Sequence, residues 1–182
     1  MRKLQTTELN RVSIEAFRSA EKLPIVVILD NVRSGHNVGS VFRSCDAFAI
    51  SSLCLCGITA SPPNREVLKT ALGSTQSVEW IYYNDSRKAV EELKQKGFQI
   101  ILAEHTTKSI LLQNFIPSKE LKYAVVFGNE VEGISSELLE LADTVIEIPQ
   151  FGTKHSLNIS VAAGIILWHL SQRLCDASHM NL

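Results

Sequence analysis

Three clusters of polar residues and glycines have the composition of a chemical site, and the first occupies positions 30–43, DNVRSGHNVGSVFR. The side-chain amide of Asn37 can both donate and accept hydrogen bonds, and Gly39 allows another backbone to approach closely. Arg43 follows one or two helical turns later and carries a planar fork of donors that suits phosphate. A structural interpretation is also open, in which Asn37 caps a helix and Arg43 is a solvated helix residue.

The second cluster is an acidic loop between two glycines, at positions 127–134, FGNEVEGI. The carboxylates of Glu130 and Glu132 repel phosphate and suit hydroxyl groups, amines or a cationic ligand. Ser135 follows the loop and is a plausible N-cap residue for the next helix. The alternative is an ordinary turn between a strand and a helix.

The third cluster occupies positions 148–158, IPQFGTKHSLN. A strand ends at Pro149, a loop holds Gly152, and a long helix is predicted to begin near Ser156, which is a natural N-cap residue. Capping explains Ser156 without any chemistry, and a polar helix start explains Asn158.

The elements that must position these clusters alternate along the chain. Short apolar, β-branched runs predict strands at 25–29, 52–56, 78–83, 98–103, 123–127 and 144–148. Apolar spacings of three and four predict helices at 7–20, 36–48, 65–72, 85–96, 135–142 and 157–173. The alternation predicts an α/β fold with a largely parallel sheet. Each cluster follows a predicted strand and so lies at the carboxyl edge of the sheet, where ligands bind.

The last predicted helix, which contains LNISVAAGIILWHL, is apolar nearly all round. A helix that covers one face of a sheet needs only one apolar stripe. The pattern therefore favours cover on two sides, with a partner subunit as the second surface. A central helix of a monomer is the alternative.

The composition is that of a globular protein, with 45% hydrophobic and 20% charged residues among 182. We expect one domain over 1–182, with 1–22 as a helical N-terminal extension. No apolar run reaches the roughly 18 residues of a membrane span, and the charged N-terminus lacks the apolar middle of a signal peptide. A cytoplasmic protein without a membrane partner is expected.

The charge is distributed unevenly, although the net charge is only −1. Residues 1–73 carry a net +3 and residues 74–182 a net −4. The basic half could present a phosphate-binding face, or the asymmetry could be a chance fluctuation.

Several familiar sites are missing from the sequence. The four cysteines, Cys45, Cys54, Cys56 and Cys175, contain only one close pair, so no zinc site or other metal is expected and the thiols are expected to be reduced. The chain also lacks G-x-G-x-x-G after the first strand, a P-loop, and the H-E-x-x-H spacing. These absences argue against a conventional dinucleotide site, an NTPase and a zinc protease.

Taken in this order, the three clusters resemble the three motifs of the SpoU (TrmH-like) RNA methyltransferase family. DNVRSGHNVGSVFRSCDAF resembles the first motif, VVFGNEVEGIS the second, and IPQFGTKHSLNISVAAGIILWHL the third. The resemblance runs from about residue 24 to 173. It implies an α/β fold with helices on both faces of the sheet and a deep C-terminal trefoil knot, a homodimer, and S-adenosylmethionine as cofactor.

The resemblance also implies the site residues. The cofactor would contact Ala103, Glu104, Gly128, Gly133, Ile148, Ser156, Leu157 and Asn158. The catalytic set would be Asn37, Arg43, Glu130, Ser156 and Asn158. RNA would be bound by Arg11, Arg18, Arg33, His36 and Arg43, because no separate RNA-binding domain precedes the matched region. Glu104 stands where family members commonly have a small polar residue, which puts its role in doubt.

The implied reaction is methyl transfer to a ribose 2′-hydroxyl of tRNA or rRNA, with a slight preference for tRNA. Arginine ordinarily keeps its proton. Arg43 would therefore either act as a base assisted by a substrate phosphate and Glu130, or stay charged and clamp the phosphate. The alternatives to ribose methylation are a non-catalytic RNA-binding protein of the same fold and a base methyltransferase.

Overall fold

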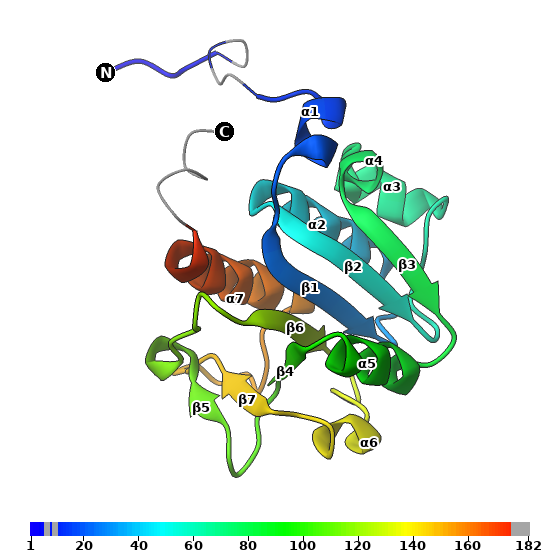
Figure 1. Ribbon diagram of the computed structural model, residues 1–182, viewed down its shortest axis with the longest axis vertical. Coiled ribbons are helices and arrows are strands. Elements are labelled where there is room, and N and C mark those ends of the chain that lie inside the picture. Colours follow the sequence, from blue (N-terminus) through cyan, green and yellow to red (C-terminus); the bar gives the residue numbers. More distant parts are fainter. Residues whose placement is uncertain (6–7, 9–10, 176–182) are drawn as a thin grey trace.

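The computed structural model describes residues 1–5, 8 and 11–175, and its centre is a seven-stranded sheet in which every pairing is parallel (Figure 1). The strand order is β3-β2-β1-β6-β4-β7-β5. The strands are β1 (Leu23–Asp30), β2 (Ile50–Cys56), β3 (Glu79–Tyr83), β4 (Phe98–Ala103), β5 (Ile110–Leu111), β6 (Lys122–Phe127) and β7 (Thr144–Glu147). The predicted parallel α/β fold is confirmed.

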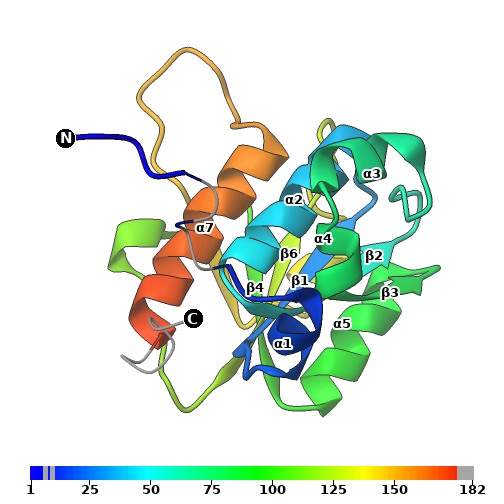
Figure 2. The ribbon, with the colours of Figure 1, turned by 90° about the horizontal axis from the view of Figure 1, so that it is seen from above.

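The helices lie on both faces of this sheet (Figures 1 and 2). They are α1 (Ile14–Ser19), α2 (Gly35–Ala47), α3 (Arg65–Ala71), α4 (Ser74–Ser77), α5 (Ser86–Gln95), α6 (Ser136–Leu139) and α7 (Ile159–Leu174), with a 3-10 turn η2 (Leu112–Asn114). Alternate residues of β1 define the two faces. Ile25 and Val27 pack in a core with α2, α3 and α7, whereas Val26 and Ile28 pack in a second core with α5 and α6. Because β1 is buried on both faces, it consists almost entirely of apolar residues.

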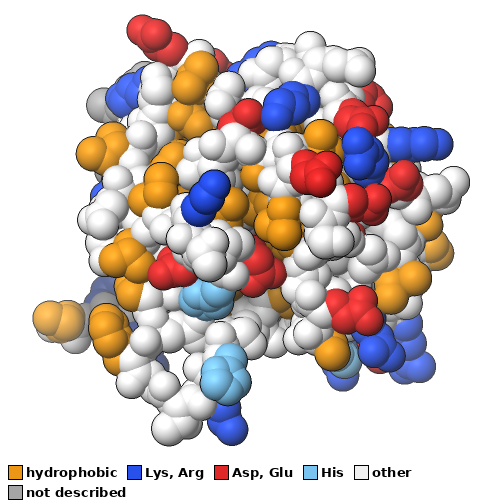
Figure 3. Space-filling view, turned by 90° about the horizontal axis from the view of Figure 1, so that it is seen from below, with side chains coloured by type: hydrophobic (Ala, Val, Ile, Leu, Met, Phe, Trp, Pro, Cys, Tyr) orange, Lys and Arg blue, Asp and Glu red, His pale blue; other side chains and the backbone are white. Residues whose placement is uncertain are grey.

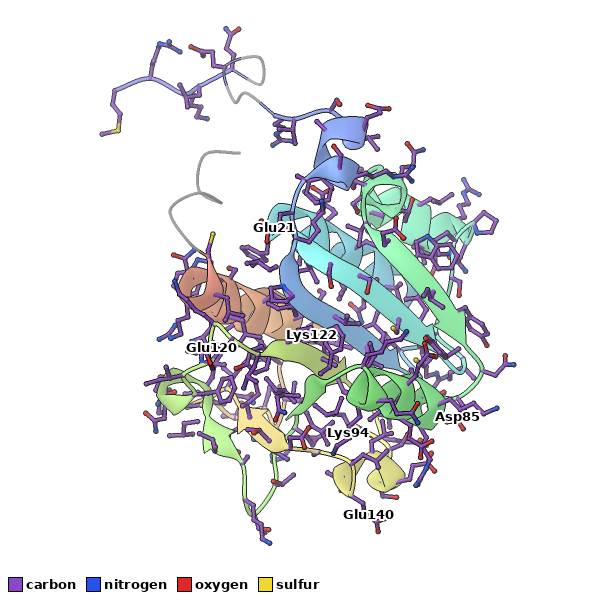
Figure 4. All side chains as sticks on the ribbon, viewed as in Figure 1. Glu21, Asp85, Lys94, Glu120, Lys122 and Glu140 are labelled. Carbon is purple, nitrogen blue, oxygen red and sulfur yellow. The ribbon has the colours of Figure 1, made fainter. Side chains whose placement is uncertain are left out.

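Polar contacts and small residues fix how the helices pack. Lys94 on α5 donates to the Leu141 carbonyl at 2.7 Å and pairs with Asp143 at 3.1 Å, which ties α5 to the segment after α6 (Figure 4). On the other face α2 approaches α3 closely. A Cβ added at Gly39 would lie 2.3 Å from the Val67 carbonyl oxygen, so only glycine fits there.

The register of the sheet brings the predicted site loops to one edge. Near the end of β1, Leu29 pairs with Phe127, the last residue of β6, and β4 pairs with β7 through Ala103 and Ile146. The chain therefore leaves β1, β6, β4 and β7 at neighbouring points of the carboxyl edge.

Several predicted boundaries are wrong. The helix predicted at 7–20 is the six-residue α1, because Ser13 caps it and residues 11–13 are not helical; positions 6–7 and 9–10 lie outside the described residues. The helix predicted at 135–142 is only four residues long. The short elements α4, β5 and η2 were not predicted, because pieces of two to four residues carry no detectable hydrophobic period.

One stripe of α7 stays uncovered. Ala163, Ile166 and Leu170 are buried against the sheet. On the opposite side Val161, Ile165 and Trp168 are 49%, 36% and 54% exposed. If α7 were the central helix of a monomer, other parts of the same chain would cover both of its sides. The single chain covers only one side.

The four cysteines form no disulfide in the described chain, and Cys45, Cys54 and Cys56 are buried. Burial raises the pKa of Cys54 to about 12. Among the described residues, no helix is long and apolar enough to cross a membrane, and no group of three or more His, Cys, Asp or Glu side chains is arranged to hold a metal ion.

Candidate functional site

Side chains from the three clusters form one hydrogen-bonded chain at the carboxyl edge. The Asn158 side-chain amide donates to the Asn37 amide oxygen at 3.1 Å, and the Asn37 amide donates to Glu130 Oε1 at 2.9 Å. Asn37 lies in the first turn of α2, Glu130 follows β6, and Asn158 is the N-cap residue of α7. The three loops, which are far apart in the sequence, therefore meet at one point. Both ends of the Asn37 amide are bonded, and neither is bonded to Arg43.

Glu130 belongs to a tightly held segment, residues 128–135, which we name the anchored loop. Its carboxylate also accepts from the backbone N–H groups of Arg33 at 3.0 Å and Ser34 at 3.1 Å. Partial burial works to raise the pKa of Glu130, but these bonds and the one from Asn37 lower it overall below its ordinary value of 4.5. The ionised carboxylate makes charge-assisted bonds, which are the stronger kind.

One predicted helix cap is confirmed in position and the other is wrong. Ser135 is the N-cap residue of α6, as predicted, but its hydroxyl donates to Asp30 at 2.8 Å instead of accepting from the helix. The N-cap of α7 is Asn158, whose side-chain oxygen accepts from the Ser160 N–H at 2.9 Å, and Ser156 lies two residues outside the helix. The structural alternative for Asn37 also fails, because Ser34 caps α2.

A cavity of about 690 Å³, which we name the edge cavity, opens beside this chain of amides. All eight residues predicted to contact a cofactor line it: Ala103, Glu104, Gly128, Gly133, Ile148, Ser156, Leu157 and Asn158. The volume is that of a site for a drug-sized molecule. Acidic side chains and histidines lie next to one another on the face shown in Figure 3, and the cavity lining has the same mixture, with Glu104, Glu130, Glu132 and Glu147 beside His105 and His155.

Glu104 connects the end of β4 to the anchored loop. Its carboxylate accepts from the Ile134 N–H at 3.1 Å. Gly133 faces it with a positive φ of 73°, and a Cβ added at Gly133 would lie 2.5 Å from Glu104 Oε2. The glycine is therefore needed both for its backbone conformation and for the close approach of Glu104.

A second polar group in the edge cavity was not predicted. His105 Nδ1 lies 3.2 Å from Glu147 Oε2, and the Gln150 amide lies 2.9 Å from His105 Nε2. Hydrogen bonds from Ser109 and His105 lower the pKa of Glu147. His105 and Gln150 follow the predicted strands at 98–103 and 144–148, and Glu147 lies near the end of the second strand, so their position at the same edge of the sheet was the available signal.

The end of the third cluster contrasts with the anchored loop. Residues 151–157, which we name the open segment, are all exposed, and Phe151 is 96% exposed. Within the described chain, none of these seven residues makes a hydrogen bond. Figure 2 shows the connection between β7 and α7 as a loop that projects from the body of the molecule.

Arg43 does not line the edge cavity of its own chain. It lies on the exposed side of α2 and lines a separate hollow of about 720 Å³, which we name the helix hollow, together with Arg11, Asp46 and Phe17. Two predicted RNA contacts, Arg43 and Arg11, are thus brought together. Arg33, His36 and Arg18 are exposed and lie outside both cavities.

Comparison with known proteins reveals an extended similarity. A model of the SpoU rRNA Methylase family matches residues 24–168. A 23S rRNA (guanosine-2′-O-)-methyltransferase of Neisseria meningitidis is 31% identical over 159 residues, which are 87% of this chain and 62% of that protein. A tRNA (guanosine(18)-2′-O)-methyltransferase of Thermus thermophilus is 32% identical over 180 residues, covering 95% of this chain and 87% of that protein.

A solved structure has a similar fold. The AdoMet-bound rRNA methyltransferase from Sinorhizobium meliloti superimposes with a TM-score of 0.78 at 26% identity, over 88% of this chain and 61% of that chain. This chain therefore spans less than two thirds of the Neisseria and Sinorhizobium proteins.

Proposed function

Because this chain belongs to the SpoU rRNA methylase family, we propose that it transfers a methyl group from S-adenosylmethionine to a ribose 2′-hydroxyl of RNA. The observation that carries the proposal is the chain of hydrogen bonds from Asn158 through Asn37 to Glu130 at the rim of the edge cavity. These hydrogen bonds join the three family motifs at one point. A protein that kept only the fold would not need all three side chains there.

The edge cavity fits the proposed cofactor. S-Adenosylmethionine carries a sulfonium cation, and the lining holds four carboxylates from Glu104, Glu130, Glu132 and Glu147. Apolar side chains such as Ile146, Ile148 and Leu157 lie beside them and can cover an adenine ring. We propose that Ala103, Gly128 and Ile148 contact the cofactor mainly through backbone groups, and that Ser156, Leu157 and Asn158 form the wall next to the methyl group.

Held by these residues, S-adenosylmethionine would supply a methyl group activated by the positive sulfur, with the neutral thioether as the leaving group. In the product the ribose oxygen carries the methyl group, and its proton passes to solvent or to a base. A 2′-hydroxyl is a poor nucleophile, so the protein must orient it and accept or direct its proton. We propose that Asn37 and Asn158 hold the hydroxyl, because their amides are fixed by Glu130 and by capping of α7.

Arg43 fits the phosphate-clamp role better than the role of a base assisted by Glu130. Both oxygens of the Glu130 carboxylate are engaged by Asn37 and by the N–H groups of Arg33 and Ser34. Arg43 instead lines the helix hollow beside Arg11. Two guanidinium groups at one hollow suit the phosphates of an RNA backbone.

We propose that the active form is a homodimer in which the exposed stripe of α7 is the contact. Val161, Ile165 and Trp168 form this stripe, and it leads from Asn158 along the helix. Arg43 does not line the edge cavity of its own chain. Pairing through α7 would bring Arg43 of one protomer to the edge cavity of its partner. The deep trefoil knot and a cytoplasmic location are part of the same proposal.

For the substrate we propose tRNA, with rRNA as the alternative. The match to the Thermus tRNA methyltransferase covers nearly the whole of both chains, whereas the match to the Neisseria rRNA enzyme leaves over a third of that protein unmatched. The exposed residues Arg11, Arg18, Arg33 and His36 would contact the RNA.

The test is transfer of a tritiated methyl group from S-adenosylmethionine to total RNA, followed by digestion to nucleosides. A 2′-O-methylated nucleoside is expected. A methylated base would replace the proposal by base methylation, and RNA binding without transfer would replace it by a non-catalytic role. Parallel reactions with purified tRNA and ribosomal fragments distinguish the two substrates.

A further inference from the structure

A buried carboxylate behind the site has no place in the reaction proposed above. Asp30, the last residue of β1, is 0% exposed, and no cation pairs with it among the residues that the structure describes. Its charge is compensated by four donors. The Asn31 amide bonds to it at 2.8 Å, the Ser135 N–H at 2.9 Å and the Ser135 hydroxyl at 2.8 Å, and the Ser86 hydroxyl is the fourth. A buried charge is tolerated only when it is compensated in this way.

One oxygen of Asp30 acts on the loop after β1. Asn31 has a left-handed backbone with a φ of 55°, and its side chain links Asp30 to the Ile58 N–H. Its carbonyl accepts from the Asn129 amide at 2.7 Å. Because the left-handed backbone of Asn31 sets the direction of the chain after β1, it aims the N–H groups of Arg33 and Ser34 at Glu130.

The other oxygen of Asp30 holds the far end of the anchored loop through Ser135. The two segments that meet at Glu130 are therefore both fixed to one buried carboxylate. Ser86 differs from the other donors, because it is the first residue of α5 and belongs neither to the loop after β1 nor to the anchored loop.

We propose that Asp30 is a positioning residue that acts through Asn31 and Ser135 to hold Glu130, and with it Asn37, in the geometry needed for methyl transfer. The inference rests on the proposed function for its kinetic consequence, but its structural consequence can be measured without turnover. Asp30→Asn is the informative change, since an amide has one acceptor oxygen and cannot accept from all four donors. Ser86→Ala is the matched control, because it removes a donor to the same carboxylate without touching either segment.

The first experiment is NMR of the folded variants, read at the backbone amides of Arg33 and Ser34. In Asp30→Asn we expect both resonances to shift and their hydrogen exchange to accelerate, although neither residue contacts Asp30. In Ser86→Ala we expect both amides to remain unchanged. Unchanged amides in Asp30→Asn, or equal changes in the two variants, would overturn the proposal. If Asp30→Asn does not fold, Ser135→Ala carries the test, with a smaller displacement expected because the Ser135 N–H still binds Asp30.

The second experiment is a double-mutant cycle of methyl transfer. We expect Asp30→Asn to lower kcat on the order of 10²-fold, as a misplaced catalytic group does, with little change in the KM for S-adenosylmethionine. If Asp30 acts through Glu130, the change costs far less in a Glu130→Gln background, because that variant has already lost the interaction. If the losses of kcat in Asp30→Asn and Glu130→Gln simply multiply in the double variant, Asp30 does not act through Glu130, and the proposal is contradicted. Lack of transfer by the unmodified chain would count against the proposed function alone, and the NMR result would still decide the role of Asp30.

Discussion

The anchored loop and the open segment both contribute residues to the lining of the edge cavity, but they are held very differently. In the anchored loop Ser135 is bonded to the last residue of β1, and Glu130 and Ile134 are bonded to the segments after β1 and β4. The open segment makes no hydrogen bond within the described chain and leaves Phe151 almost fully exposed. One wall of the cavity is therefore preorganised within a single chain, whereas the other lacks contacts that could fix it.

This difference assigns separate tasks to the two walls. A preorganised wall keeps donors and acceptors in place without a cost of ordering at the moment of reaction. A wall with few contacts can open for a ligand and be ordered by it or by a partner. We therefore expect changes near the anchored loop to alter the rate of transfer, and changes affecting the open segment to alter cofactor binding and assembly.

The largest effect is expected for Arg43→Ala, although Arg43 belongs neither to the anchored loop nor to the open segment. We expect transfer to fall on the order of 10³-fold, because the charged group that clamps the RNA phosphate is gone. Binding of S-adenosylmethionine should survive, because we assign the guanidinium to the RNA phosphate and the proposed cofactor contacts in the edge cavity do not include Arg43. Single-turnover transfer and calorimetric titration measure the two effects, with Arg65→Ala on α3 as the control. Equal loss of cofactor affinity would show that the guanidinium belongs to the cofactor wall.

The next effect is expected for Trp168→Asp, which places a charge in the uncovered stripe of α7. A buried, unpaired charge opposes association strongly, so we expect a monomer by light scattering and a loss of transfer comparable to that of Arg43→Ala. The fold should persist, because Trp168 is 54% exposed in the single chain. Gln95→Asp, at an exposed position of α5 that lines neither cavity, is the control. A Trp168→Asp protein that remained a fully active dimer would place the contact elsewhere.

The sequence predicted where the loops meet but not how they are held. Runs such as IVVIL and YAVVF identified β1 and β6, and parallel pairing then placed Asn37 and Glu130 at one edge. The partners of Asp30 at Ser86 and Ser135 are 56 and 105 residues away, and no local pattern predicts such contacts. The cap at Asn158 was misplaced for a related reason, because Ser156 and Asn158 are both good caps and only the packing of α7 distinguishes them.

A third, smaller effect is expected for the open segment in limited proteolysis. Trypsin should cut first after Lys154, which is exposed and lies in a segment without hydrogen bonds. S-Adenosylmethionine at about ten times its Kd should slow this cut roughly tenfold if binding orders the segment. Lys154→Gln removes the cleavage site and identifies the fragment. Equal cleavage with and without cofactor would mean that the second wall stays open in the bound state.

The smallest effect is expected for the acid sensitivity of the anchored loop. The pKa of Glu130 is lower in the folded protein than its ordinary value of 4.5, so its ionised form is favoured by folding. Its contribution to stability is therefore fully present above about pH 4.5 and is lost as the pH falls through the folded pKa. The free energy of unfolding should exceed that of Glu130→Gln at neutral pH, and the difference should shrink as the pH falls below about 4.5.

Comparing the unfolding of the unmodified chain with that of Glu130→Gln tests the anchored loop separately from the rest of the edge cavity. Denaturant unfolding of the unmodified chain and of Glu130→Gln across this pH range isolates the carboxylate, because every other acid, Glu147 in the edge cavity included, titrates in both proteins. The difference should be modest, since Glu130 is exposed to solvent and its bonds are partly screened. A difference independent of pH would mean that the anchored loop is held by shape and by neutral hydrogen bonds rather than by the charge of Glu130.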